Sequence, residues 1–82
     1  MAESPLIAEF TKCLGIMSHS RAGWDYYDMP RAQRLEEDRQ EKVSLSRVRA
    51  IWRENPDLQD DLRAAFDAAK PLASMREIEA PQ

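Results

Sequence analysis

The segment SPLIAEFTKCLGIM (residues 4–17) carries a continuous helical pattern near the start of the chain. Ser4 is a favourable helix cap, and Pro5 stands at the first helical position, where its missing N–H costs nothing. The apolar residues recur every three or four positions and form one stripe: Leu6, Ile7, Phe10, Cys13, Leu14 and Met17. This spacing predicts an amphipathic helix, which Gly15 either ends early or weakens in its last turn.

Two further helices are predicted by the same spacing in the second half of the chain. Ser44 stands where it can cap a helix whose apolar face consists of Leu45, Val48, Ile51 and Trp52. Asn55-Pro56-Asp57 then breaks the chain and opens another helix, because asparagine caps and proline fits a first turn. The apolar stripe of that helix comprises Leu58, Leu62, Ala65, Phe66 and Ala69, and Lys70-Pro71 marks its end.

A fourth helix is expected over residues 30–42, and its composition is unusual. Asp28 or Met29 is in position to cap it, and Pro30 to open it. Its residues favour helix, but the only apolar ones are Ala32 and Leu35. So thin an apolar stripe cannot hold a helix firmly onto a core. We therefore expect this helix to be solvated on most sides or to use the surface of a partner.

A structured aromatic loop is expected between the first two helices, over residues 18–28. This segment lacks a helical period and contains Gly23, Trp24, Tyr26 and Tyr27. Tryptophan in a chain of this length usually belongs to the core, so Trp24 is predicted to pack with Phe10, Trp52 and Phe66. The two tyrosines are adjacent and point in different directions, so at least one is expected to be accessible.

Together these patterns predict an all-α fold, a small bundle of three to four short helices. We expect one domain over residues 1–72 and a short, partly frayed tail over residues 73–82. The tail contains Ser74 and Glu77 at capping-box spacing, which favours one or two helical turns at most.

The overall composition indicates the cellular compartment and the distribution of charge. A signal peptide is not expected, because the sequence shows no basic start followed by an apolar run. No apolar stretch approaches the length of a membrane span. The one cysteine, Cys13, has no partner for an internal disulfide, which favours a reducing cytoplasm. The net charge of −3 is uneven: residues 31–53 carry +3 and residues 54–82 carry −4. These two segments can attract each other within one molecule or between two.

No catalytic or metal-binding pattern is recognisable in the sequence. His19 is the only histidine, and its spacing from Cys13, Asp25 and Asp28 matches no zinc pattern. Cys13 lies on the apolar stripe of the first helix, where a buried thiol behaves as a small hydrophobe. The chain has no phosphate-binding glycine loop and no nucleophile elbow. We therefore expect no enzyme, no cofactor and no metal.

One segment, KVSLSRVRAIWRE (residues 42–54), resembles the recognition helix of helix-turn-helix proteins. Val43 and Ser44 would form the turn and Val48 would face inward. The resemblance implies DNA binding through Ser44, Ser46, Arg47, Arg49 and Arg53, because arginines pair with guanine edges and phosphates. The preceding segment departs from the family pattern, since four acids between Glu36 and Glu41 would repel phosphates. DNA binding is therefore the alternative function.

A second likeness involves WRENPDLQDDL (residues 52–62). It is similar to a stretch of a small phage-encoded CRISPR inhibitor, and the shared letters are Trp52, Arg53, Pro56, Asp57, Leu58 and Leu62. This resemblance keeps a phage inhibitor among the candidates.

The function favoured by the sequence is binding to another protein without catalysis, as an assembly chaperone, an adaptor subunit or an inhibitor of a larger complex. The core is small, the helix over residues 30–42 has little apolar surface, and the loop before it supplies residue types that dominate interfaces. The expected binding residues are Tyr26, Tyr27, Arg31, Arg34, Leu35, Asp38 and Arg39. The expected partner is a protein or protein complex, with a homo-oligomer among the options and no membrane.

Overall fold

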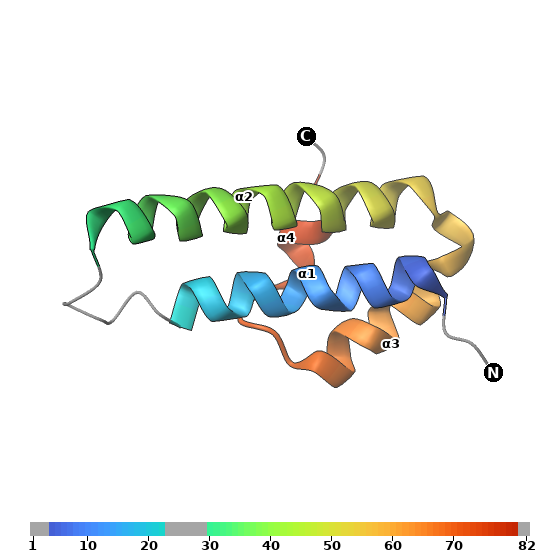
Figure 1. Ribbon diagram of the computed structural model, residues 1–82. Coiled ribbons are helices and arrows are strands. Elements are labelled where there is room, and N and C mark those ends of the chain that lie inside the picture. The colour runs from blue at the N-terminus through green and yellow to red at the C-terminus, as the bar shows by residue number, and fades with distance from the viewer. Residues whose placement is uncertain (1–3, 23–29, 81–82) are drawn as a thin grey trace.

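A computed structural model describes residues 4–22 and 30–80 of the chain. Those residues form four α-helices and one short 3₁₀ helix, with no strand among them. The elements are α1 (Pro5–Ala22), α2 (Arg31–Glu54), η2 (Pro56–Leu58), α3 (Gln59–Ala69) and α4 (Met75–Glu79). The prediction of an all-α fold is confirmed for the described residues (Figure 1).

Helix α1 begins where the sequence predicts and continues past its glycine. The N–H of Ala8 donates to the carbonyl of Ser4 at 3.0 Å, and Pro5 is the first helical residue. Gly15 does not end the helix, which runs on to Ala22. A helical glycine costs about 0.5–1 kcal/mol relative to alanine, and burial of Met17 two residues later offsets a loss of that size.

Helix α2 is one continuous helix, so the prediction of two helices divided near Ser44 is wrong. Residues 31–54 contain neither glycine nor proline, and nearly all of them tolerate helix well. A cap signal acts only where the preceding backbone leaves the helix, and nothing at residues 42–44 forces it to leave. Ser44 is instead 4% exposed and lies on the buried side of the helix.

The break after α2 lies at the predicted Asn55-Pro56, although Asn55 acts differently from the expectation. Its side-chain amide donates to the carbonyl of Ile51 at 2.9 Å. Asn55 therefore caps a carbonyl in the last turn of α2 and does not cap the N–H groups of the next helix. Helix α3 ends at Lys70, whose left-handed φ of 48° lets its N–H reach the carbonyl of Phe66 at 3.1 Å.

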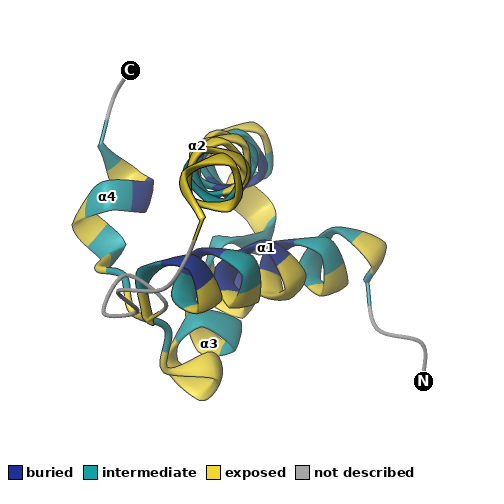
Figure 2. Ribbon diagram, turned by 60° about the vertical axis from the view of Figure 1, so that its left-hand side comes forward, coloured by how far each residue is buried: buried dark blue, intermediate teal, exposed yellow. Residues whose placement is uncertain are grey.

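Helix α1 lies between α2 and α3, while α4 packs against α2 (Figures 1 and 2). The core draws on all four helices and consists of Phe10, Cys13, Leu14, Met17, Val48, Ile51, Leu62 and Ile78. Trp52 and Phe66 are half-buried against it, and Trp24 lies outside the described residues. Burial of Ile78 to 1% exposure makes the C-terminal segment part of the core. Ser74 and Glu77 form the capping box that starts α4.

Arg21, near the end of α1, ties three helices together. Its guanidinium donates to both carboxylate oxygens of Glu77 on α4, at 2.7 and 3.1 Å, and to the carbonyl of Leu72. Its Nε lies 3.4 Å from Oε1 of Glu41 on α2, an oxygen that is buried and accepts no hydrogen bond. Arg49 adds a bond of 2.6 Å from its Nε to the carbonyl of Glu77. The short helix α4 is therefore held by charge as well as by Ile78.

Candidate interaction surface

The first two turns of α2 make little contact with the rest of the described chain. All six residues from Arg31 to Glu36 are exposed, and 60% of Leu35 is accessible to solvent. Leu35 is one of three large exposed apolar residues in the described chain, with Val43 and Leu72. The sequence expectation of a helix that the core does not hold agrees with this exposure.

The predicted binding residues on α2 are Arg31, Arg34, Leu35, Asp38 and Arg39, which we call the α2 surface. Four of them are exposed, and Asp38 is half-buried. Arg31 and Arg34 make no ion pair with any other residue that the structure describes. Tyr26 and Tyr27, predicted to belong to the same surface, lie outside the described residues.

Ion pairs along α2 neutralise the remaining charges of the α2 surface. Arg39 donates to Glu36 at 2.7 and 3.1 Å, and Gln40 donates to the same carboxylate at 3.1 Å. The bonds from Arg39 and then Gln40 lower the pKa of Glu36 to about 2. Lys42 pairs with Asp38 at 3.0 Å. The excess positive charge is therefore concentrated at the start of α2, on Arg31 and Arg34.

A groove runs between α1 and α2 beside this surface. It consists of two adjoining hollows of about 440 and 490 Å³, both lined by Lys12, Ile16 and Gln40. Cys13 and Val43 line the second hollow, and Gly15 lies in the wall of the first. We call this feature, from Glu9 to Ser20 on α1 and from Glu36 to Arg47 on α2, the α1/α2 groove.

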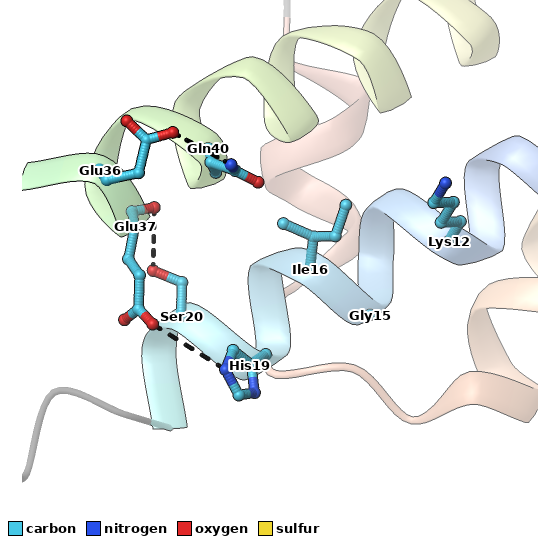
Figure 3. Close-up of a pocket in the computed structure, with 8 residues that line it drawn as sticks. All are labelled: Lys12, Gly15, Ile16, His19, Ser20, Glu36, Glu37 and Gln40. Carbon is cyan, nitrogen blue, oxygen red and sulfur yellow. Dashed lines mark hydrogen bonds and ion pairs between the residues drawn. The ribbon is translucent and has the colours of Figure 1, made fainter. Parts of the chain in front are cut away.

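Polar contacts close the two ends of the α1/α2 groove. At one end Arg47 donates to the carboxylate of Glu9 at 2.7 and 2.9 Å, and this bond lowers the pKa of Glu9. At the other end Ser20 donates to the carbonyl of Glu37 at 3.3 Å, and Nε2 of His19 lies 3.9 Å from the Glu37 carboxylate (Figure 3). These cross-links hold the two helices antiparallel and leave the groove open between them.

The residues of the DNA-binding alternative do not share one free face. Ser44 is buried, Arg47 is bonded to Glu9, and Arg49 is bonded to the carbonyl of Glu77. Ser46 and Arg53 are exposed. Because α2 is continuous through residues 42–44, the turn that a helix-turn-helix requires is absent there.

Cys13 and His19 are the cysteine and the histidine of the described chain, and both lie on α1. Cys13 is 9% exposed, and burial raises the pKa of its thiol. No group of three or more histidine, cysteine or acidic side chains gathers into a metal site within residues 4–22 and 30–80. Over the same residues, no helix has both the length and the apolar character that a membrane span requires.

The sequence reasoning missed the α1/α2 groove. The sequence does contain an indication of the groove, because Gln40 and Val43 fall on one side of α2 when residues 31–54 are treated as a single helix. The prediction of a helix break near Ser44 placed these two residues on different elements.

Comparisons with protein-family models, curated proteins and solved structures returned no match.

Proposed function

We propose that the protein works without catalysis, by binding another protein through the α2 surface and the aromatic segment that precedes it. Leu35 carries this proposal, because it is 60% exposed and is the one large apolar residue in the first two turns of α2. Burying a leucine side chain at an interface contributes about 1.5–3 kcal/mol. Tyr26 and Tyr27 immediately precede α2 in sequence and would add contact area of the kind that dominates interfaces.

The charges of the α2 surface indicate the character of the partner. Arg31 and Arg34 both precede Leu35 in the first turn of α2, at the positive end of the helix dipole, and they are unpaired among the described residues. An apolar anchor next to two unpaired cations favours a partner with an apolar pocket and an acidic group at its rim. An assembly chaperone, an adaptor subunit and an inhibitor of a larger complex all work in this way, and the phage-inhibitor resemblance keeps the last class in view.

The geometry supports protein binding better than the DNA-binding alternative. Only Ser46 and Arg53 of the five candidate residues are exposed, and two of the others already bond within the chain. A phosphate surface requires several free cations on one face. We also propose a reducing, cytoplasmic setting, because the single cysteine, Cys13, is a buried free thiol.

Affinity capture from the host with matched variants tests this proposal. We expect Leu35→Asp to abolish recovery of a partner that the wild-type chain retains, because a charge then occupies the apolar anchor. Leu72→Asp is the control, since Leu72 is 53% exposed on another part of the molecule. Both variants should melt like the wild type. Equal recovery by the two variants would refute the assignment of the α2 surface.

A further inference from the structure

We propose that a hollow between the last turns of α2, the start of α3 and α4 binds a carboxylate carried on a small apolar body. Arg49 and Arg53 pair with the carboxylate, which belongs to a free acid or to the last residue of a peptide chain. We call this feature, which measures about 260 Å³, the α2/α4 hollow. It lies at the opposite end of α2 from Leu35, so the inference goes beyond the binding function proposed above.

Two arginines without a carboxylate partner line the α2/α4 hollow. Arg49 and Arg53 lie on one side of α2, because residues four apart on a helix are neighbours. Neither forms an ion pair with a residue that the structure describes. Arg49 donates from its Nε to the carbonyl of Glu77 at 2.6 Å, which holds the guanidinium in place and leaves its two terminal nitrogens available. Free guanidinium N–H groups match the two oxygens of a carboxylate.

Among the described residues, one carboxylate lines the α2/α4 hollow, and it already has a cation. Glu79 accepts a bond of 2.8 Å from Arg63 on α3, and the guanidinium of Arg63 also lies 5.6 Å from the ring centroid of Trp52. When the Glu79–Arg63 pair is counted as neutral, Arg49 and Arg53 leave two positive charges in excess. The hollow therefore attracts an anion, although the net charge of the chain is −3.

Apolar side chains complete the wall of the α2/α4 hollow. Trp52 is half-buried on α2, Ile78 belongs to the core, and Ala80 follows α4. Small-molecule sites usually combine such apolar walls with a few polar groups that fix the orientation of the ligand. An inorganic ion would leave the apolar side chains uncovered, whereas a carboxylate on an aliphatic body would contact both parts of the wall. The wall therefore favours an organic acid.

Acids that are close in sequence to the lining residues favour a ligand with a single negative charge. Glu54 follows Arg53, and Asp57 and Asp60 stand on either side of Gln59, which also lines the hollow. These three acids form no ion pair within the described residues. They repel a phosphate dianion or a nucleic-acid strand more than they repel a single carboxylate. The charge around the hollow thus limits what the two arginines can bind.

Titration of the purified chain with N-acetyl-leucine, followed by NMR, tests the α2/α4 hollow. This compound carries one carboxylate on an aliphatic body, and N-acetyl-leucinamide is the matched compound without the charge. We expect N-acetyl-leucine to shift the indole N–H resonance of Trp52 and the amide resonance of Ala80 until they saturate, with a dissociation constant on the order of 1 mM. N-acetyl-leucinamide should shift neither. Shifts that do not saturate, or equal shifts with the amide, would overturn the proposal.

Substitution of Arg53 tests the cation that holds the carboxylate. Arg53→Gln should raise the dissociation constant of N-acetyl-leucine by roughly tenfold or more, because a charge-assisted bond is lost. The variant should melt like the wild type, since Arg53 is exposed. Lys12→Gln is the control: it removes the same charge at an exposed residue that lines the α1/α2 groove and not this hollow. Equal weakening by both variants would show that only net charge matters, which would overturn the site.

Two further probes distinguish the sources of the anion. Saturable binding of N-acetyl-Gly-Gly-Leu at the same resonances would support the end of a peptide chain as the ligand, and binding of N-acetyl-leucine alone would support a free acid. Inorganic phosphate that saturates these resonances at a lower concentration than N-acetyl-leucine would overturn the assignment of a carboxylate.

The α2/α4 hollow and the proposed binding function are tested separately. Leu35→Asp should bind N-acetyl-leucine like the wild type and still lose its captured partner. Loss of N-acetyl-leucine binding in Leu35→Asp, with an unchanged melting temperature, would overturn the assignment of the ligand to this hollow.

Discussion

At the scale of single residues, Arg21 does more for the fold than any exposed ion pair on α2. It joins α1 to Glu77 on α4, to Glu41 on α2 and to the backbone of Leu72. Its side chain is 25% exposed, whereas that of Arg39 is 66% exposed. Water screens the Arg39–Glu36 pair strongly, so a low pKa at Glu36 brings little stability.

Arg21→Met should therefore destabilise the fold by about 1–2 kcal/mol, a value discounted for partial exposure. The change leaves the carboxylates of Glu41 and Glu77 without their cation. Denaturant unfolding followed by circular dichroism measures the loss. Arg39→Met is the matched control and should leave the midpoint unchanged; an equal effect of both variants would contradict the role given to Arg21.

The same contact predicts a dependence of stability on pH. The bond from Arg21 lowers the pKa of Glu77 below its ordinary value of 4.5. This pairing therefore stabilises the fold fully above that value, and the contribution fades as the pH falls through the lower pKa of the folded state. Glu77→Gln should flatten the acid side of a plot of unfolding free energy against pH. An unchanged acid limb in that variant would contradict the assignment.

At the scale of the elements, α1 carries a glycine that the fold does not need. Gly15→Ala should stabilise the chain by about 0.5–1 kcal/mol, because alanine loses less backbone freedom on folding. Thermal melting at low concentration measures the gain. Ala8→Gly, at an exposed site of the same helix, should lose a similar amount. A destabilising Gly15→Ala would show that the chain itself requires the glycine.

The elements also show which parts of the fold the sequence can predict. Helices α1 and α3 follow from apolar spacing, because each buries one stripe against its neighbours. The continuity of α2 could not be predicted from apolar spacing, because Ser44 resembles a helix cap and the apolar pattern changes at that residue. Only packing reveals that Ser44 lies on the side facing α1 and not at a helix start. The exposure of Leu35 was predictable from its polar neighbours, whereas the groove required two helices to be placed together.

At the scale of the whole molecule, the uneven charge in the sequence has a structural counterpart. Within the described residues, the acids at the end of α2, in η2 and on α3 form no ion pair: Glu54, Asp57, Asp60, Asp61 and Asp67. Arg31 and Arg34 lie at the opposite end of α2, about 30 Å away along a helix of this length. The two cations at the start of α2 would draw an acidic partner toward the α2 surface during approach.

The central claim is that another protein covers Leu35, and photocrosslinking tests it most directly. A photoreactive amino acid is placed at position 35 or, as the control, at position 72, and each chain is irradiated in its host. The account predicts a discrete protein adduct from position 35 that is absent from position 72. Adducts of equal yield from both positions, or adducts from position 35 to nucleic acid alone, would contradict it.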